Sequence, residues 1–227
     1  MFPLRDTVPR RGPPVLTLLL IAANVAAFAF ELTLTPAELR DLFDQCGMVP
    51  ARYTDPLYAA RHLLPQRDLW PFLTSLFLHS GWLHLISNLW VLWIFGDNVE
   101  DRTGPFGFLC FYLVCGFAAG AVHLVTNPTS MLPTIGASGA IAGVMGAYFV
   151  LFPRARILTL VPVFFWPVFV ELPAVVWLGL WFLLQFYSGT LALTDQAVAG
   201  GVAWWAHVGG FLTGIALRLI FLRRRRA

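Results

Sequence analysis

Long apolar runs dominate this sequence and restrict the folds that are open to it. Six such runs are separated by polar or proline-rich segments, and their lengths are near the roughly 20 residues that a helix needs to cross a bilayer. Only 12% of the 227 residues are charged, about half the share that is typical of soluble domains. We therefore predict an all-α membrane protein, a six-helix bundle with spans at residues 15–32, 81–96, 105–125, 138–152, 172–187 and 202–222.

The segments around these spans complete the predicted domain organisation. A basic N-terminal segment precedes the six-helix domain, a long first loop follows the first span, and a short basic tail ends the chain. Their predicted bounds are residues 1–14 for the N-terminal segment, 15–222 for the domain, 33–80 for the loop and 223–227 for the tail.

Local signals predict the structure of three connections. Thr35-Pro36-Ala37-Glu38 has the pattern of a helix-capping box with proline at the first helical position, and Gly47 should end that short helix. We expect residues 63–78, which are apolar and aromatic, to lie at the membrane interface. Pro162 and Pro167 interrupt the apolar stretch 157–170, which favours an irregular connection. Residues 188–201 are mostly small and predict a loop before the sixth span.

The distribution of arginine predicts the orientation of the chain. All 15 basic side chains are arginines, and six spans would put both termini on the same side. That side would then hold eleven of them: Arg5, Arg10, Arg11, Arg102, Arg154, Arg156, Arg218 and Arg223 to Arg226. Because cytoplasmic segments are enriched in basic residues, we predict a multi-pass protein of the cell (inner) membrane with both termini in the cytoplasm. The net charge of +3 does not suggest a nucleic-acid partner.

Three polar residues then fall at one depth in the bilayer. Spans two, four and six all run from the outside to the inside, and they carry His84, Ser138 and His207 within their first one or two turns. A helical turn rises about 5.4 Å, so the three side chains should lie together just below the outer surface. Glycine and alanine recur on the faces of Ser138 and His207, which lets membrane helices pack closely.

This arrangement suits nucleophilic catalysis by a serine. A serine hydroxyl needs an adjacent base, so we predict Ser138 as the nucleophile and His207 as the base, without an orienting carboxylate. His84, Asn88 and the backbone N–H of Ser138 would stabilise the oxyanion, because donors aimed at that charge lower the barrier. Supporting roles are predicted for Gly136, Gly139, His79 and Gly210.

Simpler interpretations exist for the same residues. A serine in a membrane helix often bonds to its own backbone, and Asn88 could hold two helices together. His79, His84 and His207 could in principle bind a metal ion, but no cysteine or carboxylate joins them at that depth. We therefore predict neither a metal nor a cofactor.

The three motifs resemble those of the rhomboid family of intramembrane serine proteases. Gly136-Ala137-Ser138-Gly139 is similar to its nucleophile motif, His84-Leu85-Ile86-Ser87-Asn88 to its second-helix motif, and Ala206-His207 to its sixth-helix motif. The resemblance implies a rhomboid-like six-helix bundle, a site open to the extracytoplasmic side, a gating loop before span six, and transmembrane protein substrates. Two positions depart from the family pattern. Trp70 is followed by Pro71 instead of arginine, and Ala142 stands where many members have a tyrosine beneath the histidine.

Two other functions are compatible with a polar site among membrane helices. The first is a non-catalytic rhomboid-like chaperone or adaptor that binds client transmembrane helices. The second is a small transporter or proton path, for which the expected half-repeats are missing. The expected partners are transmembrane substrates and the lipid bilayer; the cleavage sequence, the pathway, the oligomeric state and the residue beneath His207 are left open.

Overall fold

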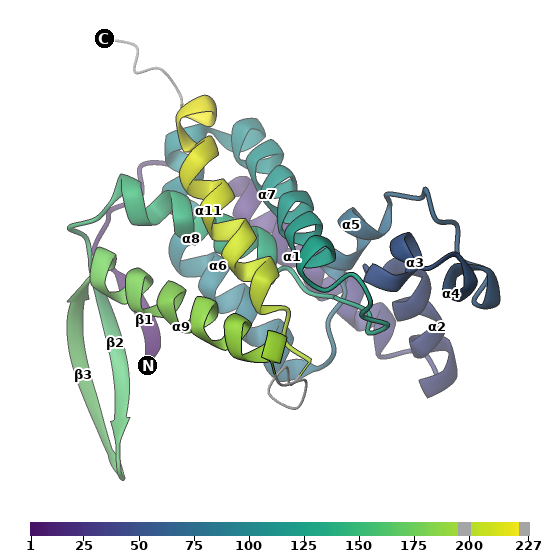
Figure 1. The fold of residues 1–227 in the computed structure, drawn as a ribbon. Helices are drawn as coiled ribbons and strands as arrows, with labels where there is room; N and C mark the ends of the chain where they lie inside the picture. The colour runs from purple at the N-terminus through teal and green to yellow at the C-terminus, as the bar shows by residue number, and fades with distance from the viewer. Residues whose placement is uncertain (195–200, 223–227) are drawn as a thin grey trace.

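The computed structural model of the protein describes residues 1–194 and 201–222, and it is mostly helical (Figure 1). The predicted loop at 188–201 and the basic tail at 223–227 therefore fall partly or wholly outside the described residues. Six longer helices are α1 (Val15–Glu31), α6 (Trp82–Thr103), α7 (Pro105–Thr126), α8 (Ser138–Leu151), α9 (Ala174–Thr194) and α11 (Trp204–Phe221). The shorter elements are α2 (Pro36–Cys46), α3 (Pro50–Thr54), α4 (Pro56–Arg61), α5 (Pro71–Thr74), the 3-10 helix η1 (Ser75–Phe77), β1 (Phe2–Asp6), β2 (Arg156–Val163) and β3 (Trp166–Pro173).

The six longer helices coincide with the six apolar runs. Among the described residues, three of them are long and apolar enough to cross a membrane: 105–126, 174–193 and 204–221. Helices α1 and α8 are apolar but shorter, with 17 and 14 residues. The helical prediction is therefore confirmed for each run, while a bundle in which all six helices cross the bilayer stays a prediction.

Two helices are longer than predicted. Helix α6 continues through Gly96 to Thr103 and ends at Gly104, whose φ is 76°. Its polar last turns are held by α1, because Glu100 accepts hydrogen bonds from the hydroxyl and the N–H of Thr17. Helix α9 continues through residues 188–194, so the loop predicted over 188–201 is wrong for that part. The indole N–H of Trp205 donates to the Gly189 carbonyl at 3.1 Å, which joins this extension to α11.

The stretch 157–170 is not an irregular connection, and the all-α prediction is wrong at this end of the molecule. Strands β2 and β3 form an antiparallel hairpin, and β1 pairs with the other side of β2 in the order β1-β2-β3. β-Branched residues favour a strand here, and the prolines are tolerated because Pro162 and Pro167 pair with each other beyond the end of β1. Asp6 at the end of β1 accepts a hydrogen bond from the Tyr148 hydroxyl of α8, and burial raises the pKa of Asp6.

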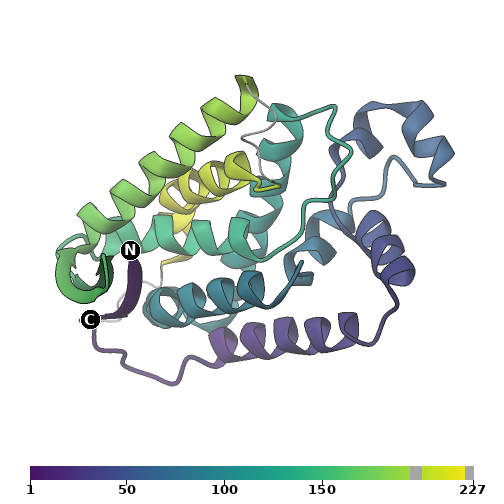
Figure 2. The same cartoon turned by 90° about the horizontal axis from the view of Figure 1, so that it is seen from below.

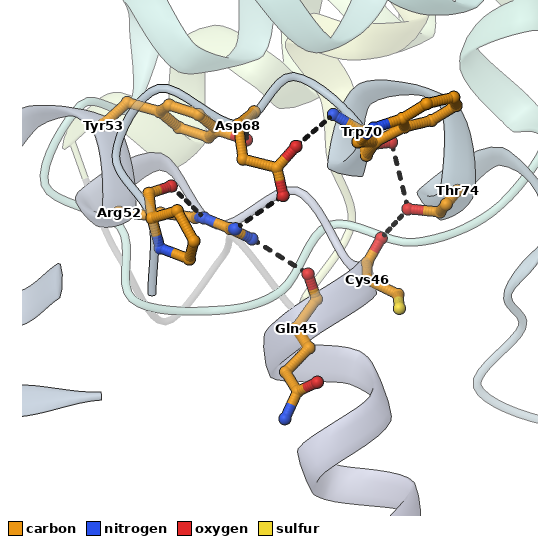
Figure 3. Close-up of polar contacts among 8 residues, drawn as sticks. Gln45, Cys46, Arg52, Tyr53, Asp68, Trp70 and Thr74 are labelled. Carbon is orange, nitrogen blue, oxygen red and sulfur yellow. Dashed lines mark hydrogen bonds and ion pairs between the residues drawn. The ribbon is translucent and has the colours of Figure 1, made fainter. Parts of the chain in front are cut away.

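The first loop contains a compact polar network (Figure 3). The capping box is present, since the Thr35 hydroxyl accepts from the Glu38 N–H and Glu38 accepts from the Thr35 N–H. Arg52 is only 1% exposed. Its guanidinium donates to the carbonyl oxygens of Gln45 and Pro65 and to the Asp68 carboxylate at 3.1 Å. These bonds fold the loop around one buried cation.

Helix α8 lies in the middle of the bundle and packs against α11 without intervening side chains. A Cβ atom at Gly210 would overlap the carbonyl oxygen of Gly139, and one at Gly214 would overlap that of Gly143. The two backbones therefore touch along both helices, as the small residues on these faces predict. Figure 1 shows α11 crossing α8, and Figure 2 shows α8 between α1 and α9. This contact brings together the first turns of α8 and α11.

Candidate active site

Ser138 and His207 meet where α8 and α11 begin. Ser138 is the first residue of α8 and His207 lies in the first turn of α11. The distance between Ser138 Oγ and His207 Nε2 is 2.8 Å, which is within the range expected for a nucleophile and its base. The structure thus brings together the two side chains that the sequence placed at one depth, although their chemical roles are not tested by this distance.

His207 has a second polar contact that the sequence analysis missed. Its Nδ1 lies 2.8 Å from Oε1 of Gln185, which is a residue of α9. An amide oxygen only accepts, so this contact puts the proton on Nδ1 and leaves the Nε2 lone pair directed at the Ser138 hydroxyl. From the sequence, only a carboxylate was expected as an orienting partner of His207. The available signal was a single glutamine inside the apolar run of residues 172–187.

Aromatic rings of two helices surround the imidazole. The Trp181 ring of α9 lies 6.0 Å from the His207 ring, centroid to centroid, with 35° between their planes. Trp204 approaches the same imidazole edge-on at 6.3 Å. Trp181 thus provides an aromatic neighbour for His207 that Ala142 of α8 cannot provide.

His84 and Asn88 line the same cavity as Ser138 and His207. The cavity has a volume of about 810 Å³, and it is bordered by the start of α6 and by residues 133–135 and 201–203. The hydroxyl of Ser80 lies 3.1 Å from Nδ1 of His84. The Asn88 amide nitrogen lies 3.0 Å from Nε2 of His79. Both predicted oxyanion donors therefore have partners that fix their side chains in the cavity wall.

None of the four predicted supporting residues lines this cavity, but each lies behind a residue that does or next to it. Gly136 has a φ of +117°, and a Cβ atom there would clash with the His84 imidazole. Gly139 and Gly210 form the backbone contact between α8 and α11. His79 is 1% exposed, and its N–H donates to the Glu31 carboxylate. Burial lowers the pKa of His79 to about 4. In residues 1–194 and 201–222, no three metal-binding side chains are grouped as ligands of one ion.

The helical bundle and the serine–histidine cavity define a membrane-embedded protein with a polar site at one end of its helices. Residues 66–224 match the Rhomboid domain, which covers more than half of the chain. The chain therefore belongs to the rhomboid family.

Several curated proteins are similar to this chain over different lengths. RHOMBOID-like protein 5 from Arabidopsis thaliana is 26% identical over 242 residues, which cover 95% of this chain and 72% of the relative. Rhomboid-like protein 11, chloroplastic, from the same plant is 43% identical over 72 residues, or 32% of this chain and 25% of the relative. Rhomboid protease GluP from Bacillus subtilis (strain 168) is 40% identical over 85 residues, or 37% of this chain and 16% of the relative. The matched parts thus span a quarter or less of the last two proteins.

Proposed function

We propose that this protein is an intramembrane serine endopeptidase that cleaves transmembrane or juxtamembrane segments of membrane proteins. The observation that carries the proposal is the 2.8 Å contact between Ser138 Oγ and His207 Nε2 at the wall of a polar cavity. Membership of a family that includes a relative named as a protease supports it.

In the proposed reaction, Ser138 attacks the scissile carbonyl of the substrate. The hydroxyl proton passes to Nε2 of His207, a bond forms between Oγ and the carbonyl carbon, and the carbonyl oxygen takes the negative charge. The imidazolium then returns its proton to the leaving amine as the peptide bond breaks. A water molecule, deprotonated by His207, hydrolyses the resulting ester and frees Ser138.

Gln185 is a positioning residue in this scheme. Its amide oxygen holds the Nδ1–H of His207, so the imidazole keeps the tautomer and the direction that proton transfer from Ser138 requires. A neutral amide cannot compensate the imidazolium charge as a carboxylate would. We therefore describe the site as a serine–histidine dyad that is oriented by an amide.

Three donors are proposed to stabilise the oxyanion: the side chains of His84 and Asn88 and the backbone N–H of Ser138. The Ser138 N–H belongs to the first turn of α8, where N–H groups have no partner within the helix and the helix dipole favours negative charge. Each such donor typically contributes about 3 kcal/mol to the stabilisation of the transition state.

The proposed orientation has six spans, both termini in the cytoplasm and the cavity open to the extracytoplasmic side. It rests on the distribution of arginine and on the shared position of the site at the starts of α6, α8 and α11. The proposed substrates are transmembrane proteins that reach the cavity from the bilayer.

The test compares Ser138→Ala with Ser87→Ala in purified protein mixed with a single-span membrane substrate. Ser87 lines the same cavity, but its hydroxyl donates to the His84 carbonyl of its own helix. We expect Ser138→Ala to lower the cleavage rate by a factor of at least about 1,000 and Ser87→Ala to remain close to wild type. A fluorophosphonate probe should label Ser138 alone.

Equal cleavage by Ser138→Ala and wild type would refute the assignment of the nucleophile. If the folded wild-type protein neither cleaves the substrate nor reacts with the probe, yet retains client helices, the non-catalytic chaperone or adaptor function takes the place of proteolysis.

A further inference from the structure

The outer half of the β2–β3 hairpin projects past the helices (Figure 1). Phe164 and Phe165 form the turn and are 94% and 98% exposed, and Trp166 is 77% exposed. The sequence has no charged residue from position 157 to 170. Apolar patches of this kind mark surfaces that bind a protein or a membrane, so the hairpin tip needs a covering partner.

One face of the hairpin is covered by the bundle at its base and uncovered farther out. Ile157 and Thr159 of β2 are both fully buried. Alternate residues of a strand share a face, so Val163, which is 43% exposed, lies on this bundle-side face near the tip. Trp166 and Val168 of β3 lie on the same face. The bundle-side face is therefore buried against the helices at the base of the hairpin and exposed nearer its tip.

The hairpin runs along the boundary at which two membrane helices end. Helix α8 ends at Leu151, and α9 begins at Ala174, directly after the last residue of β3. In Figure 2 the hairpin is seen nearly end-on, whereas α1, α8 and α9 run across the view. The hairpin therefore lies crosswise to these helices, and beyond the edge of the bundle its bundle-side face meets the region that lipid occupies.

Basic side chains surround the base of the hairpin. Arg5, Arg154 and Arg156 are exposed, and within residues 1–194 and 201–222 none of them forms an ion pair. Glu171 is the acidic residue of the hairpin. It pairs with Leu158 and therefore shares the face opposite the bundle with Arg156. Three arginines against this one carboxylate leave net positive charge where acidic phospholipid headgroups would lie.

The turn contains a bulky residue, Phe164, at a position whose backbone conformation does not favour it. Phe164 has a φ of 53°, a conformation that glycine adopts without strain and a bulky residue does not. A glycine would therefore form this turn more easily. A phenylalanine ring has a use here at a membrane interface, because interfacial elements bury such apolar side chains at the boundary of headgroups and acyl chains.

We propose that the tip and the bundle-side face of the β2–β3 hairpin insert into the interfacial layer of the bilayer beside α9, with acidic phospholipid headgroups around Arg154 and Arg156. The free backbone edge of β3 limits the depth, because unpaired N–H and C=O groups are costly in hydrocarbon. Insertion should therefore reach about 5–10 Å, as for other interfacial elements. The proposal rests on membrane embedding and not on proteolysis.

The test uses the full chain in vesicles of phosphatidylcholine and phosphatidylglycerol, with Cys46, Cys110 and Cys115 replaced by alanine. A single cysteine is introduced as Val168→Cys or Phe169→Cys and labelled with an environment-sensitive fluorophore. Val168 lies on the bundle-side face, while its neighbour Phe169 lies on the opposite face and is more exposed, 60% against 39%. Lipids that carry a quencher at a shallow or a deep carbon report the depth of each label.

We expect shallow-quencher lipids to remove most of the fluorescence at position 168 and much less at position 169. The same result in a Ser138→Ala background would separate this proposal from the proposed enzymatic function. Equal quenching at both positions would overturn the proposal, and so would reaction of Val168→Cys with a membrane-impermeant thiol reagent. A disulfide between two copies of Val168→Cys would overturn it as well, because a second copy would then cover the face.

A second variant separates insertion from folding. Phe164→Gly relieves the turn, so the thermal midpoint of unfolding should stay the same or rise. Because the variant also removes one ring from the tip, quenching at position 168 should fall. Unchanged quenching would overturn the role assigned to the tip.

Discussion

Two regions of this protein hold their backbones in place by different physical means. At the contact between α8 and α11, Gly139 and Gly210 bring two backbones together by having no side chain. In the first loop, the side chain of Arg52 joins its own helix α3 to α2 and to residues 65–68 by hydrogen bonds. The first region therefore fails when atoms are added, and the second fails when atoms are removed.

The largest effect is expected from adding one methyl group between α8 and α11. In Gly210→Ala, the new Cβ would overlap the Gly139 carbonyl, so the helices must separate at a cost of about 3 kcal/mol in the free energy of unfolding. Cleavage should be lost as well, because the 2.8 Å contact between Ser138 and His207 would lengthen. Thermal unfolding in detergent and the cleavage assay measure the two effects.

Gly179→Ala is the matched control for this variant. A Cβ at this position of α9 would have Phe149 as its nearest neighbour at 3.8 Å, so the change should be neutral or stabilise the helix by up to about 1 kcal/mol. Equal stability of the two variants would show that the backbone contact does not hold the site together.

The opposite change, removal of atoms, should destabilise the first loop. Arg52→Met leaves the Asp68 carboxylate and two carbonyl groups without their cation. Because the Asp68 side chain is 29% exposed and water can solvate it, the cost should be about 2 kcal/mol, less than that of Gly210→Ala. Limited proteolysis within residues 36–78 should accelerate, while Arg61→Met, at an exposed position, should change stability by less than about 0.5 kcal/mol. A loop in Arg52→Met as resistant to protease as wild type would contradict the role of the buried cation.

The environment of His79 leads us to predict a dependence of stability on pH. Burial, and secondarily the neighbouring His84, lowers its pKa from 6.5 to about 4. In the unfolded chain His79 therefore binds a proton near pH 6.5, whereas in the folded protein it binds one only near pH 4. The contribution of His79 to stability should therefore fall as the pH drops through this window, by about 2 kcal/mol at pH 5.

The difference between the thermal midpoints of wild type and His79→Gln, compared at pH 7 and at pH 5, measures this loss. The variant His79→Gln should have a flatter profile, whereas His62→Gln, at an exposed position, should follow wild type. A wild-type slope in His79→Gln would assign the pH dependence to another group.

The smallest effect is expected at Gln185. Its side chain makes a hydrogen bond within the closely packed helical region, as Arg52 does in the first loop. Gln185→Leu removes one hydrogen bond to His207, which is worth about 1 to 1.5 kcal/mol. We expect kcat to fall about tenfold with KM unchanged, and stability to fall by about 1 kcal/mol. Gln185→Glu keeps an acceptor and should restore most of the rate. A change in KM alone would contradict the positioning role.

Features with a local signature could be predicted from the sequence. The capping box at Thr35 and Glu38 and the helix end at Gly47 are confirmed, because both depend on residues a few positions apart. The proximity of Ser138 and His207 also followed from helix direction and small residues, although their catalytic roles stay a proposal.

Features that depend on distant partners were missed. The prolines of the hairpin disfavour a helix, but the strands are visible only with β1, which lies about 150 residues earlier in the chain. The role of Gln185 depends on its contact with His207, which is 22 residues away on another helix. Gly96 did not end α6, because it packs against Thr17 of α1. Sequence spacing alone contains none of these contacts.

The geometry at Gly136 has a consequence for variation in this protein. Its left-handed backbone and the imidazole of His84 above it exclude every side chain for two independent reasons. A library with all amino acids at this position, selected for a functional protein, should return glycine alone. Variation in the shape of the cavity should therefore arise elsewhere on its wall, at positions such as Leu83 or Ile135, where a side chain is already accommodated.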